Sequence, residues 1–134
     1  MEHGAETLDI ETCWDLLAEG RIGRVVFAEG DEIEVFPVNY SVGGRSVLFR
    51  SAPGTKLELV LERPRVAFEV DHSDDEVAWS VILWGTAERL EFDDEIEHSG
   101  VLGLVSWTPS EKHNYVRITP DRVSGRRFRR DASD

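Results

Sequence analysis

The sequence predicts a mainly β protein in which six or seven antiparallel strands and short helices form a small closed barrel. Apolar and polar residues alternate in many short segments along the 134 residues, which is typical of half-buried strands. Turns that contain glycine separate several of these segments, as expected for β-hairpins. Closure of the sheet removes exposed strand edges, and this favours a barrel over an open sheet.

A helix and three strands are expected in the first part of the chain. Asp9 can cap a helix over residues 10–19 that ends at Gly20. The alternating pattern then predicts strands over residues 22–28, 33–40 and 46–50. Turns at residues 29–32 and 42–45 would join these strands into a meander of hairpins.

The rest of the chain predicts a short helix and further strands. A helix over residues 56–61 precedes Pro64, and a strand over residues 65–70 leads into an acidic loop over residues 71–76. A long strand over residues 77–92 should bend at Gly85, because glycine suits a barrel corner or a close backbone approach. The remaining expected elements are a weaker helix over residues 94–104 and strands over residues 115–118 and 122–128.

Length and composition predict a single domain over residues 1–134. No apolar run is long enough to cross a bilayer and the first residues do not resemble a secretory signal, so we expect a cytoplasmic protein with no membrane partner. The net charge of −12, from 27 acidic and 15 basic residues, opposes binding to nucleic acid.

Both ends of the chain are expected to be flexible. This applies to the first few residues and to residues 129–134. The basic run over residues 125–131 is interpreted as a solvated or frayed end. A substrate or phosphate contact from Arg126 or Arg127 is the less favoured alternative.

Residues 50–56 join a predicted strand to a predicted helix and have the composition of a phosphate site. They combine two cations, two hydroxyl groups and a glycine in a turn, namely Arg50, Lys56, Ser51, Thr55 and Gly54. Thr55 can cap the helix, so that the first N–H groups of the helix point at the turn. These groups predict that the turn binds an anion.

The same turn also permits an interpretation without a ligand. In a capping box, Thr55 would bond to the backbone of Glu58, and the Glu58 carboxylate would bond back to Thr55. Taken alone, the turn is compatible with either interpretation.

The sequence shows no convincing catalytic or metal-binding constellation. His3, His72, His98 and His113 have no spacing that places two of them on one face of a helix or strand, so no metal site is expected. Cys13 is interpreted as packing on a buried helix face, and Trp14 and Trp84 as packing residues. No residue is assigned a catalytic role.

With this layout, the chain resembles the pyridoxamine 5′-phosphate oxidase-like family, also called the FMN-binding split barrels. The resemblance spans most of the chain and rests on Ile22-Gly23-Arg24-Val25, Pro37-Val38-Asn39-Tyr40, residues 50–56, Val66-Ala67-Phe68-Glu69-Val70 and Trp79-Ser80-Val81, in matching order and spacing. It implies a split β-barrel with a Greek-key-like topology. The chain is most similar to the short bacterial members described as flavin-binding oxidoreductases.

The resemblance implies a homodimer with one FMN in each of two clefts between the subunits. The segment Pro37-Val38-Asn39-Tyr40 would lie along the flavin ring through backbone groups, and Asn39 could also donate to a ring carbonyl. The phosphate would bind at the turn, in agreement with the interpretation from the residues alone. The implied cofactor-binding residues are Pro37, Val38, Asn39, Tyr40, Phe49, Arg50, Ser51, Thr55, Lys56, Trp79, Ser80 and, across the subunit interface, Trp107.

The implied function is an FMN-dependent oxidoreductase with a small-molecule substrate or electron donor that the sequence does not identify. Oxidation of vitamin B6 is not expected, because the authentic oxidases carry additional C-terminal Arg and His residues for pyridoxal phosphate. This chain has Arg126-Arg127-Phe128-Arg129-Arg130 with no histidine nearby. Two alternatives stay open: a reductase that uses the deazaflavin coenzyme, and a non-catalytic flavin-binding or carrier protein.

Overall fold

The computed structural model of the chain describes residues 5–51, 54, 56–62, 64–90 and 114–129. The elements in chain order are β1 (Ala5–Thr7), α1 (Ile10–Glu19), β2 (Ile22–Glu29), β3 (Glu32–Gly43), β4 (Ser46–Ser51), the 3₁₀-helix η1 (Lys56–Leu61), β5 (Arg65–Ser73), β6 (Val77–Arg89) and β7 (Asn114–Arg129).

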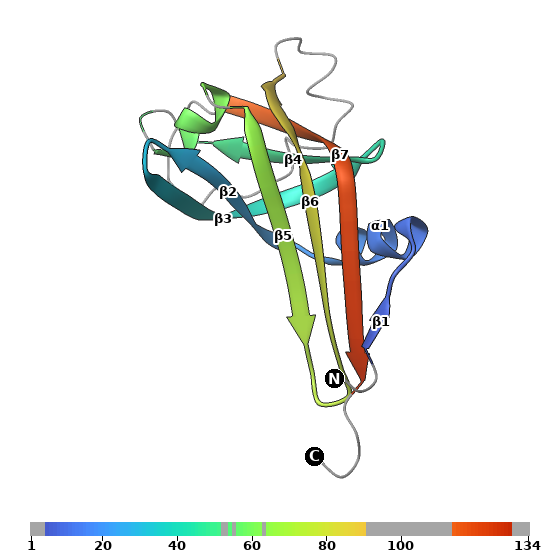
Figure 1. Ribbon diagram of the computed structural model, residues 1–134. Helices are drawn as coiled ribbons and strands as arrows, with labels where there is room; N and C mark the ends of the chain where they lie inside the picture. The colour runs from blue at the N-terminus through green and yellow to red at the C-terminus, as the bar shows by residue number, and fades with distance from the viewer. Residues whose placement is uncertain (1–4, 52–53, 55, 63, 91–113, 130–134) are drawn as a thin grey trace.

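Strands β2 to β7 close into a barrel, and β1 adds to one edge of it. The sheet order is β1-β7-β4-β3-β2-β5-β6, and pairing of β7 with β6 closes the ring. All pairs are antiparallel. Along one edge of β7, its first half pairs with β4 and its second half pairs with β1. The other edge of β7 pairs with β6 (Figure 1).

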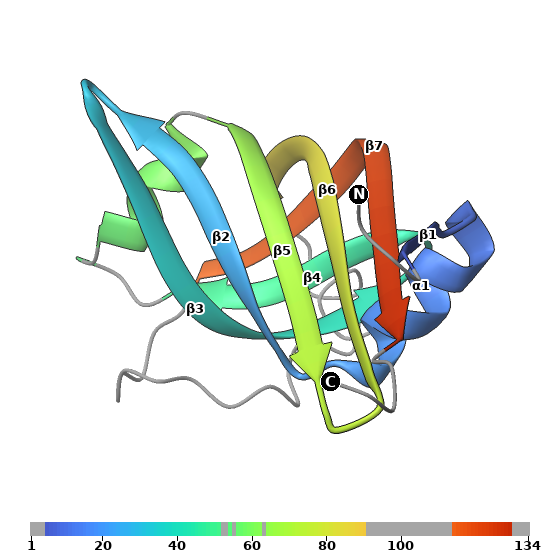
Figure 2. The same cartoon turned by 60° about the horizontal axis from the view of Figure 1, so that its bottom comes forward.

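Four of these strands have the Greek-key-like arrangement that the resemblance implies. β2, β3 and β4 follow one another through hairpins, and β5 then returns to pair with β2. The helices α1 and η1 lie on opposite sides of the barrel (Figure 2). The prediction of a mainly β fold with six or seven antiparallel strands and short helices is therefore confirmed, since the described residues form seven strands.

Helix α1 has the bounds that the capping residues predict. The Asp9 carboxylate accepts a hydrogen bond from the Thr12 N–H at 2.8 Å, and the N–H of Gly20 donates to the Leu17 carbonyl at 3.2 Å where the helix ends. The helix buries Cys13 and Trp14 against the barrel. The interpretation of both side chains as packing residues is confirmed.

Alternate side chains of the strands fill the interior of the barrel. Large apolar side chains from five strands are fully buried there, namely Val25, Phe49, Phe68, Leu83 and Ile118. Burial of this apolar surface supplies the main driving force for closure of the barrel.

Strand β6 bends at Gly85 as the sequence predicts. The register between β6 and β7 shifts between Trp84 and Gly85. A Cβ atom on Gly85 would lie 2.2 Å from the Thr119 carbonyl oxygen, so the two backbones approach too closely for any other residue. Pro120 of β7, which has no N–H to donate, lies opposite Gly85 at this irregularity. β7 therefore continues through Pro120 as one strand, whereas the sequence predicts two strands here.

Other boundaries also differ from the prediction. The sequence predicts that the basic run is a solvated or frayed end, but the run belongs to β7 up to Arg129. It is ordered as a strand because β6 pairs with one side of β7 and β1, which the sequence does not predict, pairs with the other. Glu6 of β1 also binds Arg127, with 2.7 Å between Oε1 and Nε. β5 continues to Ser73 into the predicted acidic loop, because this segment pairs with β6. The helix expected over residues 94–104 lies outside the described residues.

Candidate functional site

Strands β3 and β4 bring two predicted parts of the cofactor site side by side. Tyr40 pairs with Phe49, so the segment that ends at Tyr40 lies next to the end of β4 that carries Arg50. Because side chains alternate across a strand, Asn39 and Ser41 of β3 and Arg50 of β4 lie on the outer face of the barrel. The outer face of these two strands is therefore the candidate site.

Three polar atoms at this site are buried without a partner. Within the described part of the chain, Arg50 Nε, Ser51 Oγ and Ser41 Oγ have no hydrogen-bond partner. A buried donor that lacks a partner costs about 1–3 kcal/mol, and such groups in a folded protein require an explanation. Arg50 and Ser51 are the last two residues of β4, where the predicted phosphate site begins, and phosphate oxygens would accept hydrogen bonds from both of them. The residues present therefore fit a phosphate group.

Ser41 is absent from the set of residues that the sequence analysis assigned to the site. Its hydroxyl lies next to the segment that ends at Tyr40, on the same face as Asn39. The alternation of the strand is the signal in the sequence that would have included it.

Carboxylates contact the turn in the structure. The Gly54 N–H donates to Glu58 Oε2 at 2.9 Å, and Lys56 Nζ lies 3.2 Å from Glu34 Oε1. Glu58 thus reaches back to the turn, as in a capping box, but bonds to Gly54, while Thr55 lies outside the described residues. The Lys56 side chain is 65% exposed, so its ion pair is weak and can exchange partners. The Gly54 N–H and the Lys56 ammonium group both donate to anionic oxygen atoms at this point.

Three predicted site residues point their side chains into the core. Val38, Tyr40 and Phe49 are buried, and the Tyr40 hydroxyl donates to the Leu17 carbonyl at 2.5 Å. Burial raises the pKa of Tyr40 above its usual range. A ligand on the outer face would meet only the backbone of these residues, whereas Pro37 is exposed there.

Trp79 and Ser80 lie on β6, which is not a neighbour of β3 or β4 in the barrel. The ring of Trp79 is buried and lies 6.2 Å from the ring of His72, centroid to centroid. Within one chain, the structure therefore does not bring these two residues to Arg50. The position of Trp107 lies outside the described residues, and its role stays a prediction.

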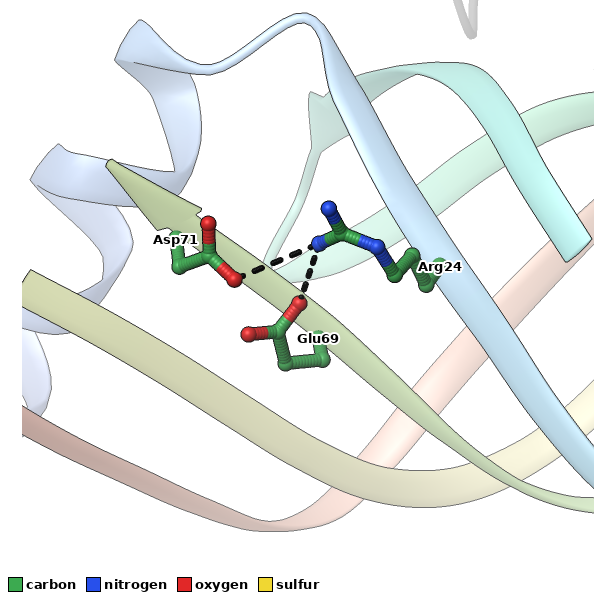
Figure 3. A network of polar contacts seen from close by, with 3 residues as sticks. All are labelled: Arg24, Glu69 and Asp71. Carbon is green, nitrogen blue, oxygen red and sulfur yellow. Dashed lines mark hydrogen bonds and ion pairs between the residues drawn. The ribbon is translucent and has the colours of Figure 1, made fainter. Parts of the chain in front are cut away.

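A cluster of charged residues that the sequence analysis missed lies on the outer face of β2 and β5. Arg24 Nη1 is 2.7 Å from Glu69 Oε1 and 3.3 Å from Asp71 Oδ2 (Figure 3). Burial, together with the hydrogen bond to Asp71 and its charge, raises the pKa of Glu69 to about 7, although Arg24 acts in the opposite direction. Arg24 and Glu69 are register partners, so only the pairing of strands far apart in sequence reveals the cluster.

Metal and membrane sites receive no structural support in the described segments. These segments contain no group of three or more His, Cys, Asp or Glu side chains that could hold a metal ion. None of their helices has the length and apolar character needed to span a bilayer.

Comparison with known proteins identifies relatives along most of the chain. A family model described as pyridoxamine 5′-phosphate oxidase matches residues 9–127. An uncharacterized protein of Mycobacterium tuberculosis is 39% identical over 88 residues, which cover 66% of this chain and 80% of that protein.

Solved structures with the same fold include two that are described as FAD-binding proteins. The FAD-binding protein of Mycobacterium smegmatis is 36% identical, with a TM-score of 0.81, and the alignment covers 94% of this chain and 100% of that one. An FAD-binding protein of Mesorhizobium loti is 26% identical, with a TM-score of 0.79, and the alignment covers 92% of this chain and 97% of that one.

Proposed function

Because the chain belongs to the pyridoxamine 5′-phosphate oxidase family, we propose that it binds a flavin nucleotide on the outer face of β3 and β4 and acts as a flavin-dependent oxidoreductase. The observation that carries this proposal is the pair of buried donors at the end of β4, Arg50 Nε and Ser51 Oγ, which have no hydrogen-bond partner in the described part of the chain. The description of two relatives as FAD-binding proteins supports a flavin.

The proposed site holds the phosphate that FMN and FAD have in common. Arg50 and Ser51 would donate to its oxygens, and Lys56 would exchange its exposed ion pair with Glu34 for the phosphate. Glu58 would have to leave the Gly54 N–H, because two anions cannot share that position favourably. The sequence predicts FMN, which is the smaller of the two ligands that would bring this phosphate to the turn.

The flavin ring would lie along β3, where Asn39 and Ser41 face outward. When bound, the flavin itself supplies the hydride and electron transfer. The chain therefore needs to bind and orient the ring and the small-molecule substrate, and no protein acid or base is required. This agrees with a sequence that lacks a catalytic constellation.

The proposal includes a homodimer that pairs through the outer face of β2 and β3. Three large apolar side chains on these strands are solvent-exposed in one chain: Ile22 at 46%, Ile33 at 72% and Val35 at 53%. Large apolar side chains gathered on one face favour an interface over solvent. A second copy would also supply residues such as Ser80, which one chain keeps away from its own Arg50, whereas the ring of Trp79 is buried in the core of its own chain.

Titration of the purified protein with FMN and with riboflavin tests the phosphate site. Arg50→Ala should weaken FMN binding about tenfold or more, because it removes a charge-assisted contact of about 1.5–3 kcal/mol. Riboflavin, which has no phosphate, should bind to the variant as it binds to the wild type. Arg45→Ala is the matched control, since Arg45 is an exposed arginine before the other end of β4 and pairs with Glu11. Equal losses for FMN and riboflavin would contradict the phosphate role of Arg50.

A further inference from the structure

The charged cluster around Arg24 lies between two exposed apolar side chains of the outer face. On β2, Ile22 precedes Arg24 on this face and is 46% exposed. On the other side of Arg24, Val26 pairs with Val35 of β3, which is 53% exposed. A second copy that covers both Ile22 and Val35 therefore also covers the cluster.

The cluster carries more negative than positive charge. The Arg24 guanidinium is shared by the carboxylates of Glu69 and Asp71, whose side chains are 25% and 50% exposed (Figure 3). The residues opposite on the flanking strands are uncharged, since Pro37 of β3 faces Arg24 and Ile82 of β6 faces Glu69. With both carboxylates ionised, one positive and two negative charges leave the cluster with a net charge of −1.

The other ionisable groups near this face lie farther away or contact other side chains. On β7, Arg122 and Arg126 are separated from β5 by β6, and the Arg122 guanidinium lies 4.2 Å from the centroid of the Trp84 ring. At the end of β5, His72 Nε2 lies 3.6 Å from Asp74 Oδ2. Within the described residues, the cluster thus gains no second cation.

Dimerisation over this face would bring two such clusters into one interface and exclude water from both. A two-fold interface uses the same patch from both copies. Burial of an ionised carboxylate without a matching cation is unfavourable, whereas a protonated carboxyl group removes the excess charge. Burial, together with the hydrogen bond to Asp71 and its charge, already raises the pKa of Glu69 to about 7 in the single chain. Exclusion of water by a second copy would raise this pKa further.

We propose that each copy takes up one proton at Glu69 when two copies pair over the cluster, so that the dimer is favoured at low pH and dissociates as the pH rises. Above the pKa of the single chain, the dimer holds protons that the monomer has lost, and the association constant therefore falls with increasing pH. The proposal rests on the proposed function, because it uses the dimer face assigned there. It adds that pH controls the assembly of the shared flavin cleft.

Sedimentation equilibrium of the full chain at about pH 6 and about pH 8.5, at constant ionic strength, tests this coupling. The dimer dissociation constant of the wild type should rise at least about tenfold between the two values. Glu69→Gln should dimerise equally tightly at both, and at the higher pH it should dimerise at least about tenfold more tightly than the wild type. Asp71→Asn is the second variant, because it also removes the excess negative charge, and it should likewise remain dimeric at the higher pH.

Two control variants should keep the pH dependence of the wild type. Glu88→Gln alters an exposed carboxylate that pairs with Arg117, outside the cluster. His72→Gln removes an imidazole, which titrates in the same pH range as the proposed group. A pH dependence that disappears in His72→Gln and persists in Glu69→Gln would overturn the assignment to Glu69.

The remaining outcomes separate this inference from the proposed function. A wild type that dimerises equally tightly at both pH values would overturn the proton uptake and leave the dimer and the flavin site intact. A wild type that is monomeric at both values would overturn the proposed dimer, and the proton uptake with it. Flavin titration of the same samples reports on the flavin site independently of either result.

Discussion

Arg24 and Glu69 are register partners on neighbouring strands, and Arg24 Nη1 lies 2.7 Å from Glu69 Oε1. The pair lies on an outer face that also carries exposed apolar side chains, and Asp71 shares the same guanidinium (Figure 3). One cation thus serves two carboxylates, of which Glu69 is the more buried. Glu69 consequently keeps its proton to a higher pH than an exposed glutamate.

This relationship predicts how stability depends on pH. The pKa of Glu69 rises from 4.5 to about 7 on folding, so between these values the folded state binds more protons than the unfolded state. The free energy of unfolding should therefore fall as the pH rises through this window. Glu69→Gln cannot titrate and should remove this contribution.

Chemical denaturation of the wild type and of Glu69→Gln at several pH values between 4.5 and 7 measures the effect. The difference in stability between the two proteins should change steadily in favour of the variant as the pH rises. Glu88→Gln serves as the control, because Glu88 is an exposed carboxylate that pairs with Arg117. Parallel curves for the wild type and Glu69→Gln would show that Glu69 titrates like an exposed glutamate.

Tyr40 should contribute to stability through its hydroxyl and not to flavin affinity. The hydroxyl donates to the Leu17 carbonyl at the end of α1, inside the protein. Tyr40→Phe removes a buried hydrogen bond and should lower the free energy of unfolding by about 1 kcal/mol. Tyr115→Phe is the natural control, since the sequence has two tyrosines and Tyr115 is only partly buried.

Thermal unfolding and flavin titration on the same samples test this assignment. Flavin affinity should be the same in the wild type and in Tyr40→Phe, because the side chain faces the core. A loss of affinity at unchanged stability would instead give the Tyr40 hydroxyl a place in the cofactor site.

The features predicted well from the sequence are those set by local chemistry. The bounds of α1 follow from Asp9 and Gly20, and the hairpins follow from turns that contain glycine. The bend at Gly85 follows from a glycine inside a long alternating segment. Each of these signals lies within a few residues of the structure that it determines.

The features missed by the sequence analysis depend on contacts between distant segments. Glu69 lies 45 residues from Arg24, and only the pairing of β5 with β2 brings the two together. β7 passes through Pro120 because the bulge at Gly85 accommodates it, and no local rule predicts this coincidence. Ser41 is an exception, because the alternation along β3 alone places it on the same face as Asn39.

A cofactor site shared between two copies requires an interface, and we expect this interface on the outer face of β2 and β3. Val35 is 53% exposed and pairs with Val26, so a second copy that covers this face would bury apolar surface from both strands. Val35→Asp would place a carboxylate in that interface, where burial of the charge is unfavourable. The variant should still fold, because the side chain is exposed in the single chain, but it should be monomeric at micromolar concentration. If the flavin cleft is shared between copies, its flavin affinity should fall together with the dimer.

Sedimentation velocity and flavin titration of the wild type and Val35→Asp measure both effects. Ile10→Asp provides the control, because Ile10 is 57% exposed on α1 and belongs to neither β2 nor β3. A wild type that sediments as a monomer with flavin bound would refute the shared cleft. A Val35→Asp protein that remains dimeric would place the interface on another face, and the assignment of Ile22, Ile33 and Val35 to it would then be wrong.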